Sequence, residues 1–266
     1  MKVHADLLEA YDNQVRAAEA SHLAPGVYAE ADGPIVRIVG QHQGFISAPV
    51  ELGIEGDALS ALIARQRDFF AERGEGVEWK TRGHDRPAEV FEQLRAAGFT
   101  PEDQETVMIG RVAELAGMPS PLPQGVTIRR TTKESDLQAV AAMESEVWGD
   151  DLSWMANDLI GRVGLGPDAI AVFVAEAVGQ VVSGAWLVSN PPTEFAGLWG
   201  GSTRANWRGR GIYRALVRER AQLAASWGAT YLQVDASDNS RPILERLGFI
   251  AVTTTTPYVW KPGMGL

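Results

Sequence analysis

The segment 206–216, NWRGRGIYRAL, places three arginines and two glycines directly before an apolar helical repeat. Ile212, Leu216 and Leu223 recur at helical spacing, so a helix is predicted to begin in this segment and to end at Gly228. A helix N-terminus offers unpaired amides and about half a positive charge, which together bind phosphate. The glycines allow the backbone to approach a ligand closely. The segment therefore predicts a turn that binds a polyphosphate.

The charge around this turn supports the same prediction. Glu219 is the only acid between residues 204 and 220, a stretch that contains Arg204, Arg208, Arg210, Arg214, Arg218 and Arg220. Arginines on an amphipathic helix usually face solvent, so Arg218 and Arg220 are predicted to be solvent-exposed. Arg208 and Arg210 precede the helix and are predicted to face the ligand. The segment is not a dinucleotide fingerprint, because the third glycine would fall at Arg214, and it lacks the Lys-Ser/Thr of a P-loop.

Composition excludes several classes of protein and site. The chain has 266 residues, a formal net charge of −10 and a pI near 5.0, which argues against general nucleic-acid binding. It has no cysteine, and its four histidines lack metal-ligand spacing, so no disulfide, cysteine nucleophile or metal site is expected. The N-terminus carries Asp6 and Glu9 where a secretory signal would be apolar, and no later run could span a bilayer. A cytoplasmic location is expected.

Three prolines divide the chain. Pro119, Pro121 and Pro123 alternate with small or apolar residues, so residues 119–125 are predicted to form a linker between halves at 1–118 and 126–266. Periodicity in the first half predicts a helix at 4–20, strands at 26–31, 34–39 and 44–47, a helix at 57–73, a strand at 77–81, a helix at 86–97 and a strand at 104–112.

The second half repeats this order in fuller form. It predicts a strand at 126–130, a helix to about 147 with a Thr131–Glu134 capping box, a helix at 152–162, strands at 170–176, 180–189 and 194–203, the arginine-rich helix, a strand at 230–235, a helix at 239–247 and a strand at 249–260. The two halves share an internal sequence similarity, because residues 86–99 and 241–249 both begin with Arg-Pro, contain a leucine in a predicted helix and end with Gly-Phe. Two related α/β halves are therefore predicted.

The stretch STRANWRGRGIYRAL, residues 202–216, resembles the acyl-CoA loop of the GNAT superfamily of N-acyltransferases, whose signature is R/Q-x-x-G-x-G/A. Arg208 and Gly211 match this signature, and Tyr213 replaces its last small residue. The element order of the second half is also similar to that family, and the first half resembles a degenerate copy, as in tandem GNAT proteins. The resemblance implies two GNAT-like halves, each with a mixed, mostly antiparallel sheet flanked by helices.

The resemblance also implies a site for acetyl-CoA in the second half. The backbone of Gly201, Ser202 and Thr203 would pair with the pantetheine, and Asn239 would contact the CoA arm. The amides of the following turn would hold the pyrophosphate: Arg208, Gly209, Arg210, Gly211, Ile212 and Tyr213. The matching loop of the first half, residues 51–59, holds Glu51, Glu55 and Asp57, which would repel phosphate, so one cofactor site is expected.

The implied chemistry is direct attack of a substrate amine on the thioester, with backbone amides near Gly201 stabilising the oxyanion. Two departures from the family leave the proton transfers unassigned, because Gly197 stands where several members have a base glutamate and Leu244 where a tyrosine is usual. No catalytic side chain is therefore assigned. The candidate bases are Glu194 and Glu146, and the candidate acids are Ser237 and Tyr258, although such residues are more often structural or solvent-exposed.

The amine pocket of this family usually lies under the first two helices of the catalytic half. That stretch contributes Trp148 and Trp154 with the acids Glu144, Glu146, Asp150 and Asp151, a set that suits a cationic substrate with an apolar body. The alternative interpretation is a pair of core tryptophans with solvated acids at helix ends. Glu146, Trp148 and Trp154 are taken as the candidate substrate-binding residues.

The sequence thus predicts an N-acetyltransferase that uses acetyl-CoA and acts on the amine of a small molecule or peptide, without a metal. The alternatives are a non-catalytic acyl-CoA-binding protein, favoured by the two missing side chains, and acyl transfer to a thiol or carrier protein. Neither a nucleic-acid nor a membrane partner is expected, and the protein is predicted to be a monomer or a homodimer.

Overall fold

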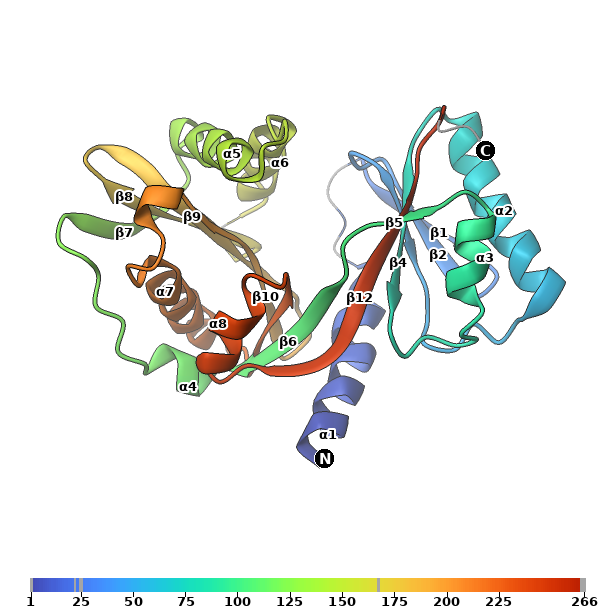
Figure 1. The fold of residues 1–266 in the computed structure, drawn as a ribbon, viewed down its shortest axis with the longest axis horizontal. Helices are drawn as coiled ribbons and strands as arrows, with labels where there is room; N and C mark the ends of the chain where they lie inside the picture. Colours follow the sequence, from blue (N-terminus) through green and yellow to red (C-terminus); the bar gives the residue numbers. More distant parts are fainter. Residues whose placement is uncertain (1, 22, 24–25, 167, 264–266) are drawn as a thin grey trace. The chain divides into compact units, whose positions relative to one another are not determined.

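A computed structural model describes residues 2–21, 23, 26–166 and 168–263 (Figure 1). Internal contacts divide the chain into two compact units. The first unit comprises residues 1–108, 235–242 and 251–266, and the second comprises residues 109–234 and 243–250. The chain thus passes between the units several times, and the predicted division at residues 119–125 does not coincide with this partition.

The first unit contains a five-stranded section of sheet in the order β1-β2-β3-β4-β12. Neighbouring strands are antiparallel except β3 and β4, which are parallel. Its elements are α1 (Lys2–Ala10), with helical turns at Tyr11–Val15 and Arg16–Ala18, β1 (Tyr28–Asp32), β2 (Ile35–Val39), β3 (Gly44–Ser47), α2 (Gly56–Glu72), β4 (Val77–Arg82), α3 (Val90–Ala96) and β5 (Thr100–Pro101). Strand β12 (Ile250–Trp260) pairs with β4 over residues 255–260, which explains why the end of the chain belongs to the first unit.

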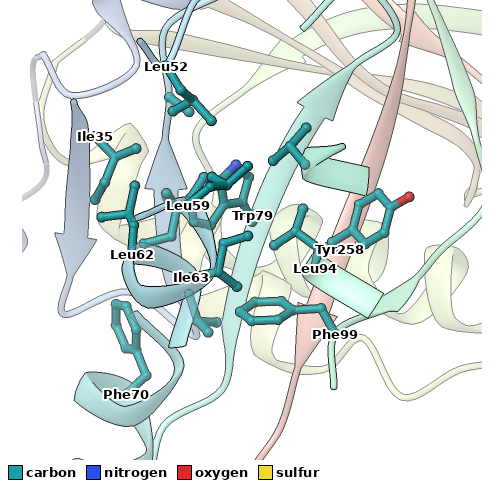
Figure 2. Packing of buried hydrophobic residues seen from close by; sticks show 14 of the residues in the cluster. Ile35, Leu52, Leu59, Leu62, Ile63, Phe70, Trp79, Leu94, Phe99 and Tyr258 are labelled. Atoms are coloured by element: carbon teal, nitrogen blue, oxygen red, sulfur yellow. The ribbon is translucent and has the colours of Figure 1, made fainter. Parts of the chain in front are cut away.

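The core of the first unit forms where α2 and α3 pack on this sheet (Figure 2). Helix α2 contributes Leu59, Leu62, Ile63 and Phe70, whose spacing places them on one face. Trp79 of β4 is 1% exposed and lies at the centre of the cluster. The apolar periodicity in the sequence therefore marks the buried face of α2 correctly.

The second unit is a three-layer structure with the strand order β7-β8-β9-β10-β11. Its elements are α4 (Val112–Ala116), β7 (Val126–Thr131), α5 (Glu134–Trp148), α6 (Trp154–Val163), β8 (Ile170–Ala177), β9 (Gln180–Ser189), β10 (Phe195–Thr203), α7 (Ile212–Ser226), β11 (Tyr231–Ala236) and α8 (Arg241–Arg246). Helices α5 and α6 cover one face of the sheet, and α7 covers the other. Strands β6 (Glu105–Arg111) and β11 each contain a point at which the chain passes from one unit to the other.

Strand β8 shows why both faces of this sheet are covered. Ile170, Val172 and Val174 belong to the cluster beneath α5 and α6, while Ala171 and Phe173 belong to the cluster with α7. A strand buried on both faces has an almost continuous apolar sequence instead of an alternating one. The sheet thus separates two hydrophobic cores.

The predicted mixed, mostly antiparallel architecture is confirmed, and nearly every predicted element is present within a few residues. Two short elements, α4 and β5, were not predicted. The capping box is wrong, because the hydroxyl of Thr131 accepts a hydrogen bond from the Lys133 amide and donates to Asp136 instead of capping α5. Residues 119–123 have no regular structure, as expected, but they connect α4 to β7 within the second unit.

Both units contain the same crossover. In the first unit, β3, α2 and β4 form a parallel strand–helix–strand connection, and β10, α7 and β11 do so in the second. The glycine-rich turn before α7 therefore has a positional counterpart before α2.

Candidate functional site

Strand β10 has one edge that is paired only in part. It pairs with β9 from Ala196 to Thr203, whereas its recorded parallel pairing with β11 runs only from Phe195 to Gly197. The two strands therefore separate after Gly197. The edge of β10 that faces away from β9 can consequently offer main-chain groups to an extended ligand.

A bulge interrupts β10 in this separated section. Gly200 pairs with Ala185 and Ser202 with Gly184, so Gly201 is the extra residue. Gly200 and Gly201 have φ angles of 64° and 97°, which favour glycine.

Aromatic rings close both faces of this bulge. A Cβ atom on Gly200 would lie 2.4 Å from the ring of Trp186, and one on Gly201 would lie 2.7 Å from the ring of Tyr213. Both positions therefore require glycine for sterics as well as for conformation. Two adjacent glycines in a strand are the signal that predicts such a bulge.

Arg220 supports the bulge from the α7 side. It is 1% exposed, and its Nη1 atom donates to the carbonyl oxygens of Trp199 at 3.2 Å and Trp186 at 3.4 Å. The interpretation of Arg220 as a solvated residue is therefore wrong, because it shares the buried face of α7 with Leu216. Burial lowers the pKa of Arg220 to about 10, so the guanidinium remains charged at neutral pH.

The turn after β10 leads into the N-terminus of α7. A short 3-10 helix, Ala205–Trp207, is followed by Gly209 and Gly211 with φ angles of 72° and 85°. Gly211 is the N-cap of a 15-residue helix, so the first amides of α7 point into this turn. The arrangement satisfies the structural requirement for a phosphate-binding helix terminus.

The arginines of the turn have different roles. The Nε atom of Arg208 donates to the carbonyl oxygen of Thr203 at 2.8 Å, which holds the turn against the end of β10. The guanidinium of Arg210 lies 5.0 Å from the ring centre of Trp207, and its side chain is exposed. Arg204 donates to the carbonyl oxygen of Val181 and pairs with Glu146. The turn thus presents two exposed guanidinium groups to solvent, those of Arg208 and Arg210.

On the opposite face of the sheet, three side chains connect α5 to β10. The carboxylate of Glu144 is buried, and its Oε2 atom accepts from the Ser202 hydroxyl at 2.5 Å and from Trp148 Nε1 at 3.0 Å. Trp148 Nε1 also lies 3.0 Å from the Ser202 hydroxyl, while its ring is 59% exposed. The other carboxylate oxygen, Oε1, is buried without a hydrogen-bond partner in the described part of the chain. Burial raises the pKa of Glu144, and the hydrogen bonds oppose that shift.

The remaining predicted ligand residues are distributed as follows. Ile212 is 1% exposed and belongs to the core beneath α7, so it can offer only its backbone. The pKa of Tyr213 is raised because the ring is buried against Gly201. Trp154 begins α6 and is 41% exposed. Asn239 lies in the turn between β11 and α8, among residues that belong to the first unit.

Of the two candidate bases, Glu146 forms an ion pair with Arg204, and Glu194 lies away from the bulge. Glu194 precedes β10, seven residues from Gly201 along the strand, or about 20 Å, and accepts from the Thr230 hydroxyl. Leu244 is fully buried. The space beside Gly197 is taken by Trp199, because a Cβ atom there would lie 2.9 Å from Trp199 Nε1. Sequence reasoning missed this filling of the usual base position.

The two candidate acids belong to the first unit. Tyr258 is 2% exposed and packs in the cluster with Trp79 and Leu94 (Figure 2), which identifies it as a core residue. The Ser237 hydroxyl lies 3.3 Å from that of Ser240 in the turn before α8.

Among residues 2–21, 23, 26–166 and 168–263, no cluster of histidine, aspartate and glutamate has the arrangement of a metal site. Within the same ranges, no helix combines the length and apolar character needed to cross a bilayer.

A comparison with known protein families gives a match over part of the second unit. Residues 136–249 match the sequence model of the acetyltransferase (GNAT) family. No curated protein gave a significant match to the chain.

Three solved structures share the fold at low sequence identity. A GCN5-related N-acetyltransferase from Kribbella flavida is 15% identical with a TM-score of 0.69, covering 98% of this chain and 95% of its own. A tandem GNAT protein from the clavulanic acid biosynthesis pathway is 14% identical with a TM-score of 0.61, covering 100% and 96%. A GCN5-related N-acetyltransferase from Sphaerobacter thermophilus is 15% identical with a TM-score of 0.60, covering 99% and 94%.

Proposed function

We propose that the second unit transfers an acetyl group from acetyl-CoA to the amine of a small molecule or peptide, because residues 136–249 match the acetyltransferase (GNAT) family model. The observation that best supports this proposal is the continuity of two features. The released edge of β10 beyond Gly197 leads directly into the glycine-rich turn at the N-terminus of α7. An extended thioester ligand with a pyrophosphate needs such a strand edge and helix terminus in succession.

In this proposal, Gly201, Ser202 and Thr203 pair through their backbone with the pantetheine. The carbonyl oxygens of Ser202 and Thr203 each accept one hydrogen bond within the protein, from the Ser183 hydroxyl at 2.6 Å and from Arg208 Nε at 2.8 Å, and each keeps a second lone pair for the ligand. The amides from Arg208 to Tyr213 hold the pyrophosphate, and Arg210 adds its exposed charge. Asn239 remains a predicted contact to the CoA arm.

The reaction uses the bulge as its electrostatic centre. The amine nitrogen attacks the thioester carbonyl carbon, and the amides of Gly200 and Gly201 stabilise the negative charge that develops on oxygen. The carbon–sulfur bond then breaks, and the sulfur leaves as a thiolate that takes up a proton. One oriented donor of this kind commonly contributes about 10²- to 10³-fold in rate. Trp148 and Trp154 are proposed to contact the acceptor, with Glu146 near it.

The first unit is proposed to be a non-catalytic, GNAT-like structural partner. Its counterpart of the cofactor turn carries Glu51, Glu55 and Asp57. The amide of Gly56 at the start of α2 donates to Glu89 Oε1 at 2.6 Å. A carboxylate of the protein thus takes the place that a phosphate would need, which supports one cofactor site per chain.

Calorimetric titration with acetyl-CoA tests this proposal. Arg210→Glu is expected to weaken binding at least about tenfold, or 1.4 kcal/mol, because it places a negative charge beside the pyrophosphate. The side chain is exposed, so the fold is not expected to change. The matched control is Glu55→Arg in the first unit, which is expected to leave the affinity unchanged. Two acetyl-CoA molecules bound per chain, or normal binding by Arg210→Glu, would contradict the assignment.

Release of free CoA with a panel of amines and thiols separates the candidate activities. Consumption of an amine supports the proposed acetyltransferase, and consumption of a thiol alone supports acyl transfer to a thiol or carrier. Binding of acetyl-CoA without turnover supports the acyl-CoA-binding alternative, which the glycine at position 197 and the buried Leu244 favour.

A further inference from the structure

We propose that Glu144 accepts the proton of the acceptor amine, and that the Ser202 hydroxyl relays it. This inference rests on the proposed acetyltransferase activity and supplies the base that the sequence could not identify. It follows from the position of one buried carboxylate beside the separated section of β10.

The geometry provides a continuous path. The Ser202 hydroxyl donates to Glu144 Oε2 at 2.5 Å, a short hydrogen bond along which a proton can move. Ser202 directly follows the extra residue of the bulge, and its side chain is only half-buried, so a substrate bound at the bulge can reach its hydroxyl. Trp148 Nε1 donates to both oxygens of this pair and fixes their orientation.

The carboxylate of Glu144 is hydrogen-bonded on one oxygen only. Oε2 receives donors from Ser202 and Trp148, whereas buried Oε1 has no partner in the described structure. Leaving a buried acceptor unpaired costs about 1–3 kcal/mol, and more when the group is charged. The ionised form is therefore poorly stabilised, and Glu144 takes up a proton more readily than an exposed glutamate does.

No recorded charge near Glu144 offsets this effect. Strands β9 and β10 contain no ionisable side chain, and the charges of the other packed elements are engaged in ion pairs of their own. The other acidic residues on α5, α6 and β8 form the following ion pairs: Asp136 and Glu176 with Arg129, Glu146 with Arg204, and Asp158 with Arg162. Glu134 lies exposed in the first turn of α5. Burial and hydrogen bonding therefore control the protonation of Glu144.

The proton transfer is balanced. A proton of the substrate ammonium passes to Ser202 Oγ as the Ser202 hydroxyl proton passes to Glu144 Oε2. The substrate then carries a neutral amine with a free lone pair, and Glu144 becomes a neutral carboxylic acid. The positive and negative charges are removed together, so no net charge is left in the buried site.

Glu144 could instead have a purely structural role and link α5 to β10 without taking up a proton. The substitution Glu144→Gln distinguishes this structural role from the role as a base. The glutamine keeps the size and the acceptor oxygen for Ser202 and Trp148, but it cannot take up a proton. Loss of the base is expected to lower kcat about 100-fold at pH 7. The dissociation constant of acetyl-CoA is expected to stay within about twofold, which also verifies the fold. Glu134→Gln on the same helix is the control and should behave as wild type.

The pH dependence of kcat with two amines of different pKa gives the decisive measurement. For the wild type, the midpoint of the rising limb is expected to be the same for both amines, because Glu144 titrates. For Glu144→Gln and for Ser202→Ala, the midpoint is expected to follow the pKa of the amine.

Three results would count against the inference. A wild-type midpoint that follows the amine, or a Glu144→Gln enzyme with unchanged kcat, overturns the role of Glu144 while leaving the acetyltransferase intact. Absence of turnover by the wild type with every amine, while acetyl-CoA still binds, overturns the proposed function itself and this inference with it.

Discussion

The substitution Gly201→Ala tests whether the bulge of β10 depends on glycine. Its φ of 97° lies in the left-handed region, where an alanine costs about 1–2 kcal/mol. Its Cβ would lie 2.7 Å from Tyr213 Cε2, and overpacking of this kind costs about 1–3 kcal/mol more. The expected loss in unfolding free energy is therefore about 2–5 kcal/mol.

Gly209→Ala is the matched control for this substitution. Gly209 also has a positive φ, 72°, but a Cβ atom there would meet nothing within 4 Å. Only the conformational cost of about 1–2 kcal/mol is expected. In a Tyr213→Ala background, Gly201→Ala should also cost only this amount, because the clashing ring is absent.

Urea unfolding followed by tryptophan fluorescence measures these differences. The second unit holds six of the eight tryptophans, so the signal reports mainly on it: Trp148, Trp154, Trp186, Trp199, Trp207 and Trp227. The reasoning is refuted if Gly201→Ala and Gly209→Ala are equally destabilised, or if Tyr213→Ala brings no relief.

Three further predictions concern a buried cation, a buried acid and the two units. Arg220→Lys is expected to lose about 2 kcal/mol of stability and to lower kcat, because an ammonium cannot reproduce the guanidinium contacts to Trp186 and Trp199; unchanged urea midpoints would contradict this. Burial, with help from Asp235, raises the pKa of Glu105 from 4.5 to about 7. As the pH rises, the unfolded chain therefore loses this proton at a lower pH than the folded protein does. The free energy of unfolding should fall by on the order of 1–3 kcal/mol between pH 4.5 and 7. Urea titrations across that range should show a smaller fall for Glu105→Gln. Deleting residues 1–118 is expected to give an aggregating product, because β12 loses its partner strand β4 and the buried ring of Tyr258 becomes exposed. A monodisperse fragment in size-exclusion chromatography would count against this prediction.

The sequence predicted the local features of this protein, such as the buried faces of helices and the glycine-rich turn. Apolar spacing defines α2 and α7 because a helix presents every third or fourth residue to the same side. The turn at Gly209 and Gly211 was predictable because glycine readily adopts the positive φ angles that tight turns need, and both residues have such angles. The resemblance carried by Arg208 and Gly211 pointed to the family whose model matches residues 136–249.

Arg220 illustrates what helical spacing leaves undetermined. Its position on α7 is compatible with solvent or with the sheet, and only the bulge carbonyls of Trp186 and Trp199 decide between them. The sequence also could not show what occupies the position where the family usually has a base. Only the structure shows that the side chain of Trp199 fills the space beside Gly197.

The pairing of Glu144 with Ser202 joins residues 58 positions apart, and the pairing of β12 with β4 joins residues more than 170 positions apart. Side-chain periodicity reports which residues face a core, but it contains no information on which distant segment supplies the partner. That choice depends on how strands pair and helices pack once the chain is compact, because burial and hydrogen bonding reward the arrangement as a whole. The tertiary structure alone therefore decided which strand completes the first unit and which carboxylate meets the candidate site.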